Sequence, residues 1–115
     1  MNADLHPLDV QTITALLRPV FCRHRIAKAI LFGSYARGEP SRRSDIDLII
    51  IQQTQKRFME RYDGFLRELT AAVPGTYVEP LIYTPEELER IASRPFIAKI
   101  LREGKVIYES EESAG

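Results

Sequence analysis

Two short segments of this chain hold side chains that could do chemistry together. Residues 33–38 (GSYARG) form a glycine-serine turn after an apolar run, and residues 44–48 (SDIDL) hold two carboxylates one residue apart. Gly33 lets the backbone approach a phosphate closely, while Ser34 and Arg37 offer donors to its oxygens. Asp45 and Asp47 repel each other unless a cation neutralises them, and a pair of Mg²⁺ ions suits that need. The combination predicts a site for a nucleoside triphosphate and Mg²⁺.

Strand geometry predicts that the two carboxylates project together. Alternate side chains of a strand share a face, so Asp45 and Asp47 lie roughly 6–7 Å apart along the strand. Ile46 and Leu48 then point to the opposite face and anchor the strand in the core. The connection from Gly33 to Asp45 is short, which favours antiparallel neighbours and brings the turn beside the acids.

Glu79 is the candidate for a third acid. It stands near the start of a predicted strand over residues 76–83, and a helical crossover would place that start level with Asp45 and Asp47. Glu79 could then bind a metal ion, take a proton from an attacking hydroxyl group, or both. Pro80 removes a backbone donor and suggests an edge strand or a bulge. Arg37 has a simpler alternative role, which is a surface ion pair with Glu39.

The remaining elements form an alternating pattern that predicts an α/β fold. Apolar spacing indicates helices over residues 8–23, 56–73 and 95–102, with Pro19 expected to kink or end the first. Thr84 and Glu87 form a capping box at the start of a helix that runs to about Ala92. Short apolar runs predict strands over residues 26–32, 45–51 and 106–108. Residues 56–61 are interpreted as a solvated helix face, whereas Tyr62, Phe65 and Leu69 are expected in the core.

Composition limits the class of protein. The chain has 115 residues with no net charge, so a broad nucleic-acid footprint is not expected, although Arg37, Arg42 and Arg43 could form a local basic patch. The single cysteine, Cys22, is expected to pack as a small apolar group. Residues 1–8 show no leader, and the longest apolar run is too short for a bilayer. We expect one cytoplasmic domain over residues 1–110, an acidic tail at 111–115 and no membrane contact.

The paired motif resembles the signature of the polymerase-beta-like nucleotidyltransferase superfamily. Gly33-Ser34, ten intervening residues and Asp45-Ile46-Asp47 look like its minimal bacterial and archaeal members, and weaker similarity continues to residue 108. The resemblance implies a mixed sheet of three to four strands covered by helices. It also implies Mg²⁺-dependent transfer of AMP from ATP, with Gly33 and Ser34 holding phosphate and Asp45, Asp47 and the third acid binding metal.

Minimal members of this superfamily are often antitoxins encoded beside a HEPN-type ribonuclease toxin. Several are similar to enzymes that attach AMP to a tyrosine of the toxin, which makes such a toxin the implied partner. The third acid of the family is commonly aspartate, whereas this chain has Glu79. Two alternatives remain open, namely a binding module that neutralises a toxin without catalysis and a transferase that acts on RNA or a small molecule. Oligomers are compatible with the sequence.

Overall fold

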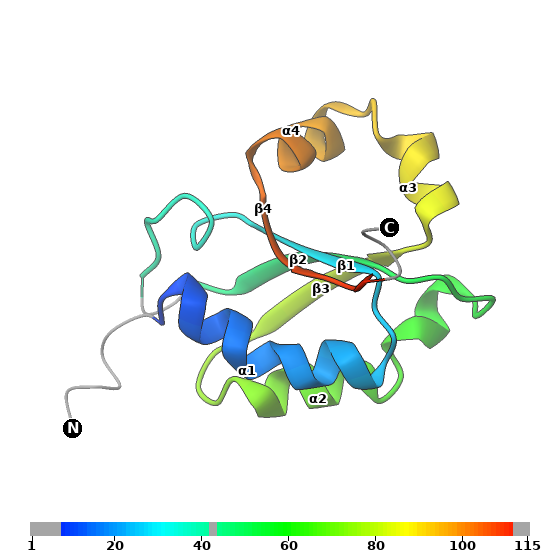
Figure 1. Cartoon of the computed structure of the whole chain (residues 1–115). Helices are drawn as coiled ribbons and strands as arrows, with labels where there is room; N and C mark the ends of the chain where they lie inside the picture. Colours follow the sequence, from blue (N-terminus) through cyan, green and yellow to red (C-terminus); the bar gives the residue numbers. More distant parts are fainter. Residues whose placement is uncertain (1–7, 42–43, 112–115) are drawn as a thin grey trace, which may run out of the picture.

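The fold places a four-stranded sheet between two layers of helices (Figure 1). The computed structural model describes residues 8–41 and 44–111. The elements in chain order are α1 (Val10–Arg23), β1 (Lys28–Phe32), β2 (Ile46–Ile51), the 3₁₀ helix η2 (Phe58–Tyr62), α2 (Phe65–Ala72), β3 (Val78–Tyr83), α3 (Pro85–Ile91), α4 (Pro95–Glu103) and β4 (Lys105–Glu109). The predicted strands and most of the predicted helices are therefore confirmed.

The sheet is mixed, in the order β3-β2-β1-β4. β1 pairs antiparallel with both β2 and β4, whereas β2 and β3 are parallel and are joined by a crossover that contains α2. The α/β class and the mixed sheet are confirmed. β3 is an edge strand, as Pro80 suggested, because proline cannot donate a hydrogen bond to a further strand.

Each face of the sheet packs against its own pair of helices. In β2, Ile46, Leu48 and Ile50 belong to the core beneath α1 and α2, while Ile49 belongs to a smaller cluster with residues of α3 and α4. This division follows from the alternation of side chains along a strand. Asp47 has the same parity as Ile49, so it lies on the sheet face that α3 and α4 cover. The smaller cluster leaves room on that face for a site.

Local signals account for the starts of two helices. Asp9 accepts a hydrogen bond from the backbone N–H of Thr12 (2.7 Å), which caps α1. Thr84 and Glu87 form the predicted capping box at α3. Pro19 does not end α1, which continues to Arg23. Tertiary packing of this amphipathic face outweighs the backbone hydrogen bond that a proline removes.

The single helix predicted over residues 56–73 is wrong. Gly64 adopts a φ of 77°, a left-handed conformation that separates η2 from α2. Glycine adopts this conformation without steric cost, so the apolar spacing continues while the helix does not. The solvated-face interpretation is also wrong for Arg61, which is only 7% exposed. Phe65 and Leu69 are buried as expected, and Tyr62 is half-buried against the same core.

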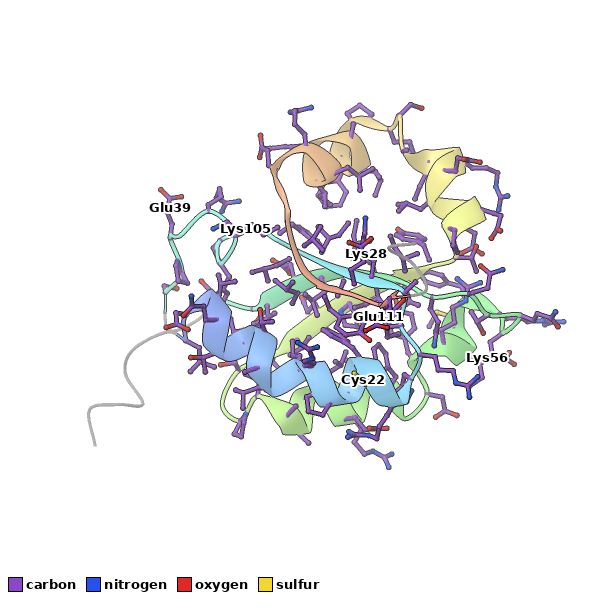
Figure 2. The ribbon with its side chains drawn as sticks, viewed as in Figure 1. Cys22, Lys28, Glu39, Lys56, Lys105 and Glu111 are labelled. Atoms are coloured by element: carbon purple, nitrogen blue, oxygen red, sulfur yellow. The ribbon has the colours of Figure 1, made fainter. Side chains whose placement is uncertain are left out.

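Three remaining expectations concern the surface and the termini. Cys22 is exposed rather than packed, and its Sγ lies 3.6 Å from the Tyr108 hydroxyl group. Figure 2 shows Cys22 on α1. Within the described ranges, no helix has the length and apolar character needed to cross a bilayer. Arg42, Arg43 and residues 112–115 of the predicted tail lie outside the described residues. The single domain over residues 1–110 stays a prediction.

Candidate active site

Three strands bring the predicted site residues into one row across the sheet. Phe32 of β1 is the register partner of Asp47 in β2, and Asp47 is the register partner of Glu79 in β3. Neighbouring strands lie about 4.8 Å apart, so these positions are adjacent across the sheet. Asp45 immediately precedes β2. The predicted level placement of Glu79 beside the aspartates is confirmed at the backbone.

The glycine turn directly contacts this row. Gly33 follows the last residue of β1 and has a φ of 79°. A Cβ atom built on Gly33 would overlap Asp47 Oδ2 and would lie 3.3 Å from Asp47 Cγ. The backbone conformation favours glycine at this position, and any side chain there would have to push the Asp47 carboxylate aside. The turn and the acid belong to one site.

The turn holds a fixed shape through its own backbone and two buried side chains. The Arg37 N–H donates to the Gly33 carbonyl (3.1 Å), and the Glu39 N–H donates to the Ser34 carbonyl (2.9 Å). Tyr35 and Ala36 are buried in the core beneath the sheet. A helical turn leaves its first N–H groups without partners inside the turn. Ser34 therefore lies in a segment that is suited to an anion.

The electrostatics of Asp47 show which charged side chains act on it. Burial raises its pKa above the ordinary value, and the neighbouring charges of Glu79 and then Asp45 raise it further, while Arg37 lowers it. Like charges disfavour the ionised form of a carboxyl group, and an opposite charge favours it. Glu79, Asp45 and Arg37 are therefore all near enough to act on the charge of Asp47.

Arg37 makes the simpler contact that the sequence left open. Its Nε lies 3.5 Å from Glu39 Oε1, and the two side chains are 56% and 74% exposed. Figure 2 shows Glu39 in the loop between β1 and β2. An exposed pair of this kind contributes little to stability, so Arg37 can leave Glu39 for a stronger anion.

The chemistry of the acids fits Mg²⁺, although the acids are not gathered into a finished metal centre. In the part of the chain that the structure describes, no three acidic, histidine or cysteine side chains are grouped closely enough to hold a metal ion. Hard cations prefer carboxylate oxygens, and mutual repulsion around Asp47 is what a cation would relieve. Because Asp47 and Glu79 stand on adjacent backbone positions, side-chain rotation alone can bring their oxygens together.

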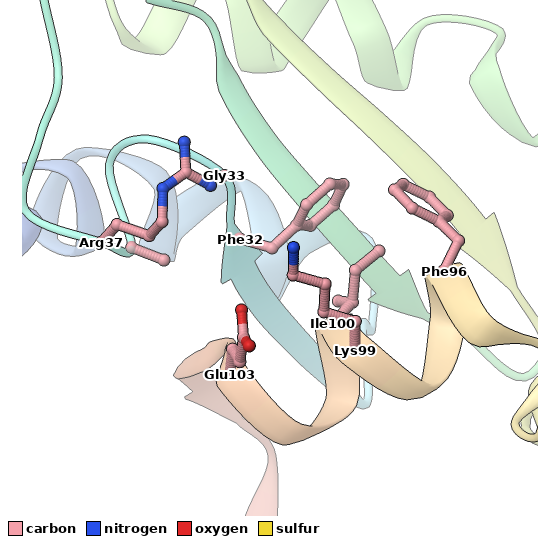
Figure 3. A pocket seen from close by; sticks show the side chains of 8 residues that line it. Phe32, Gly33, Arg37, Phe96, Lys99, Ile100 and Glu103 are labelled. Atoms are coloured by element: carbon pink, nitrogen blue, oxygen red, sulfur yellow. The ribbon is translucent and has the colours of Figure 1, made fainter.

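Sequence reasoning missed a pocket beside the turn, with a volume of about 210 Å³. Figure 3 shows it between α4 and the end of β1. Its lining residues are Phe32, Gly33, Ala36, Arg37, Phe96, Lys99, Ile100 and Glu103. Phe96, Lys99 and Glu103 recur at helical spacing, which puts them on one side of α4. That spacing is visible in the sequence, but nothing in it shows that this side faces the turn.

Comparisons with known proteins agree with this geometry. The family model described as Polymerase beta, Nucleotidyltransferase matches residues 16–113. A Methanocaldococcus jannaschii protein, provisionally named a protein adenylyltransferase, is 35% identical over 86 residues, which cover 71% of this chain and 58% of that protein. A second protein of the same organism and provisional name is 32% identical over 88 residues, covering 75% of this chain and 82% of its own length. The chain thus spans less than two thirds of the first relative.

Solved structures share the fold. A crystal structure of a toxin–antitoxin with AMP-PNP gives a TM-score of 0.61 at 24% identity, covering 91% of this chain and 77% of that one. A tri-AMPylated Shewanella oneidensis HEPN toxin in complex with its MNT antitoxin gives 0.60 at 17% identity, covering 91% and 76%. At these identities the likeness concerns the fold, which is the one that the sequence predicted.

Proposed function

Because the chain belongs to the polymerase beta nucleotidyltransferase family, we propose that it transfers AMP from ATP to a hydroxyl group of another molecule. The observation that carries this proposal is the contact between the Gly33 turn and Asp47, in a row that continues to Glu79. A triphosphate needs donors and cations side by side, and this contact supports the proposal because it brings the donors of the turn beside a carboxylate that would hold a cation.

The reaction forms one bond and breaks another at the α-phosphorus. The acceptor oxygen attacks this atom, the bond to the oxygen that bridges to the β-phosphate breaks, and pyrophosphate leaves. Gly33, Ser34 and Arg37 hold the phosphates, and the carboxylate of Glu79 takes the proton of the attacking hydroxyl group. Asp45, Asp47 and Glu79 would hold Mg²⁺. When bound, Mg²⁺ would neutralise the charge that builds up on the phosphate oxygens.

The proposed acceptor is a tyrosine of a partner HEPN-type toxin. Two observations support this choice. The curated relatives carry provisional names as protein adenylyltransferases, and the fold is shared with an MNT antitoxin seen in complex with a HEPN toxin. The acceptor would present its own tyrosine to the row of acids. Transfer to such a tyrosine would make the chain an antitoxin that acts by covalent modification.

Radiolabel transfer tests the proposal directly. The purified chain is incubated with Mg²⁺, ATP labelled at the α-phosphate and the protein encoded by the neighbouring gene. We expect label on a tyrosine of that protein, lost when Asp47→Asn is used. Asp63→Asn is the matched control, since Asp63 is exposed at the end of η2 and away from the row. It should transfer label at the wild-type rate.

Other outcomes separate the competing functions. A tight complex without label would favour the binding module and contradict catalysis. Label on RNA or on a small molecule, with none on the protein, would retain the transferase and overturn its acceptor. Full transfer by Asp47→Asn would refute the metal assignment of the row.

A further inference from the structure

The pocket between α4 and the glycine turn shares Gly33 and Arg37 with the phosphate site proposed above, but its residues from α4 have no role in that chemistry. Its wall includes Gly33, so whatever occupies it lies next to the triphosphate. Its volume of about 210 Å³ is below the roughly 300–1,000 Å³ of pockets that enclose a whole ligand. The pocket therefore has room for one part of a ligand whose other part is held at the turn.

Two aromatic rings give the pocket its shape. The rings of Phe32 and Phe96 are 6.1 Å apart between centroids and nearly perpendicular, at 85°. Phe96 is 59% exposed, so the part of its ring that Phe32 does not cover is open to a ligand. A planar ring that stacked on the free face of Phe96 would meet the side of Phe32. Such aromatic platforms bind nucleobases because every base has a π-face.

The polar groups of the pocket match the edge of a base. Figure 3 shows Lys99 and Glu103 extending from α4 towards β1 and Arg37. The ammonium group of Lys99 donates hydrogen bonds and the carboxylate of Glu103 accepts them. A nucleobase such as adenine offers ring nitrogens as acceptors and an amino group as a donor. A phosphate offers acceptors only, so it could pair with Lys99 and Arg37 but would leave the Glu103 carboxylate without a donor.

The order of the strands decides between the two molecules that the site must hold. Phe32 and the pocket lie on the β1 side of Asp47, and Glu79 lies on the opposite, β3 side. The acceptor hydroxyl group must approach Glu79, which is to take its proton. The pocket is thus on the side of the nucleotide rather than that of the acceptor.

We propose that this pocket binds the base of the nucleoside triphosphate, stacked on Phe96 and held at its polar edge by Lys99 and Glu103. The proposal rests on the proposed function, because it concerns the same substrate. On this proposal, residues of α4 select the nucleotide by its base. The turn and the acids hold the phosphates, which all nucleoside triphosphates share.

Calorimetric titration with Mg²⁺ present separates the base from the phosphates. The two probes are ATP and inorganic tripolyphosphate, which lacks the base and the sugar. In Phe96→Ala we expect affinity for ATP to fall roughly tenfold, as loss of one stacking platform does, while affinity for tripolyphosphate stays unchanged. Phe96→Tyr should retain ATP binding. Met59→Ala is the matched control, since Met59 is 75% exposed on η2 and lies outside the pocket.

The possible results divide cleanly. An equal loss for ATP and tripolyphosphate in Phe96→Ala would make the pocket a phosphate site and overturn the proposal. Unchanged binding of both probes, combined with slower transfer to the acceptor, would make it an acceptor site and overturn the proposal too. If the wild-type chain binds neither probe, the proposed function fails together with this inference. The first two results would leave the proposed function intact.

Discussion

Asp47 and Glu87 are both half-buried carboxylates, but their neighbours treat them in opposite ways. Glu87 receives two hydrogen bonds from Arg61, at 2.6 and 2.9 Å, and a third from the Thr84 N–H at 3.0 Å. The bonds from Arg61, followed by the one from Thr84, lower the pKa of Glu87 to about 2. Burial and the charges of Glu79 and Asp45 instead raise the pKa of Asp47.

The difference teaches how to separate structural from functional acids in this fold. Arg61 also donates to the carbonyls of Lys56 and Ile82, so the ion pair with Glu87 ties η2 to β3 and α3. The charge of Glu87 is thereby satisfied within the protein. The charge of Asp47 has no such set of hydrogen bonds from an arginine, and the carboxylates of Glu79 and Asp45 lie near it. A carboxylate whose neighbours carry the same charge is a candidate to bind a cation from solution.

The largest expected effect concerns activity. Asp47→Asn should lower the rate of nucleotide transfer on the order of 10²–10³-fold, because it removes a charge that acts on the developing transition state. Glu87→Gln should leave the rate close to wild type, provided that the measurement is made below its lower melting temperature. Initial rates with labelled ATP check both variants. Equal losses in the two variants would erase the distinction between them.

For the free energy of unfolding, we expect a larger effect from loss of the Arg61–Glu87 pair than from loss of the Asp47 charge. Arg61→Ala should lower the free energy of unfolding by about 3 kcal/mol, because breaking a buried pair leaves its partners without hydrogen bonds. Asp47→Asn should be as stable as wild type or slightly more stable at pH 7, since it relieves repulsion. Urea denaturation measures both values. Arg67→Ala, at an exposed position of α2, is the control and should change stability by less than about 0.5 kcal/mol.

Addition of Mg²⁺ should stabilise the protein through the acids of the row. A ligand that binds only the folded state at a hundred times its dissociation constant stabilises it by about 2.7 kcal/mol. We expect the melting temperature to rise with Mg²⁺ in wild type and in Glu87→Gln, and to stay constant in Asp47→Asn. A rise in Asp47→Asn equal to that of wild type would place the ion elsewhere.

The smallest effect is a difference in pH dependence. Glu87 has a folded pKa below its unfolded value of 4.5, so its stabilising contribution is present above pH 4.5 and is lost as pH falls towards 2. Asp47 has a folded pKa above its unfolded value of 3.8, so its charged form destabilises the folded state. This destabilisation is relieved as pH falls through the folded pKa. Thermal melts from pH 7 to 2 should therefore show a smaller fall in melting temperature on acidification in Glu87→Gln than in wild type. In Asp47→Asn the fall in melting temperature should be steeper than in wild type.

Sequence alone was sufficient for the parts of the molecule that depend on short-range patterns. The capping box at Thr84, the position of β2 and the level of Glu79 follow from local chemistry, alternation and a standard crossover. Gly64 could not be recognised as a break, because its positive φ depends on how η2 and α2 pack. Arg61 was misjudged for a related reason, since its partner Glu87 lies 26 residues away.

The site shows the same division between local and long-range information. The turn and Asp45 and Asp47 were recognisable because their spacing is fixed by one short connection. The pocket of Phe96 and Lys99 was not, since it depends on how α4 lies against β1. The roles of all these residues stay predictions until the variants are measured.

The contact between Gly33 and Asp47 has a consequence for the substitutions that each of the two positions tolerates. Any side chain at position 33 must displace the Asp47 carboxylate from its present position, so a change at one position also moves the acid at the other. The backbone φ of 79° favours glycine at position 33 in any case, so the Asp47 carboxylate adds a second, independent constraint on the same position. Replacement of Asp47 by a residue without a branched side chain end would remove the second constraint and leave only the first, so the two positions are coupled in one direction.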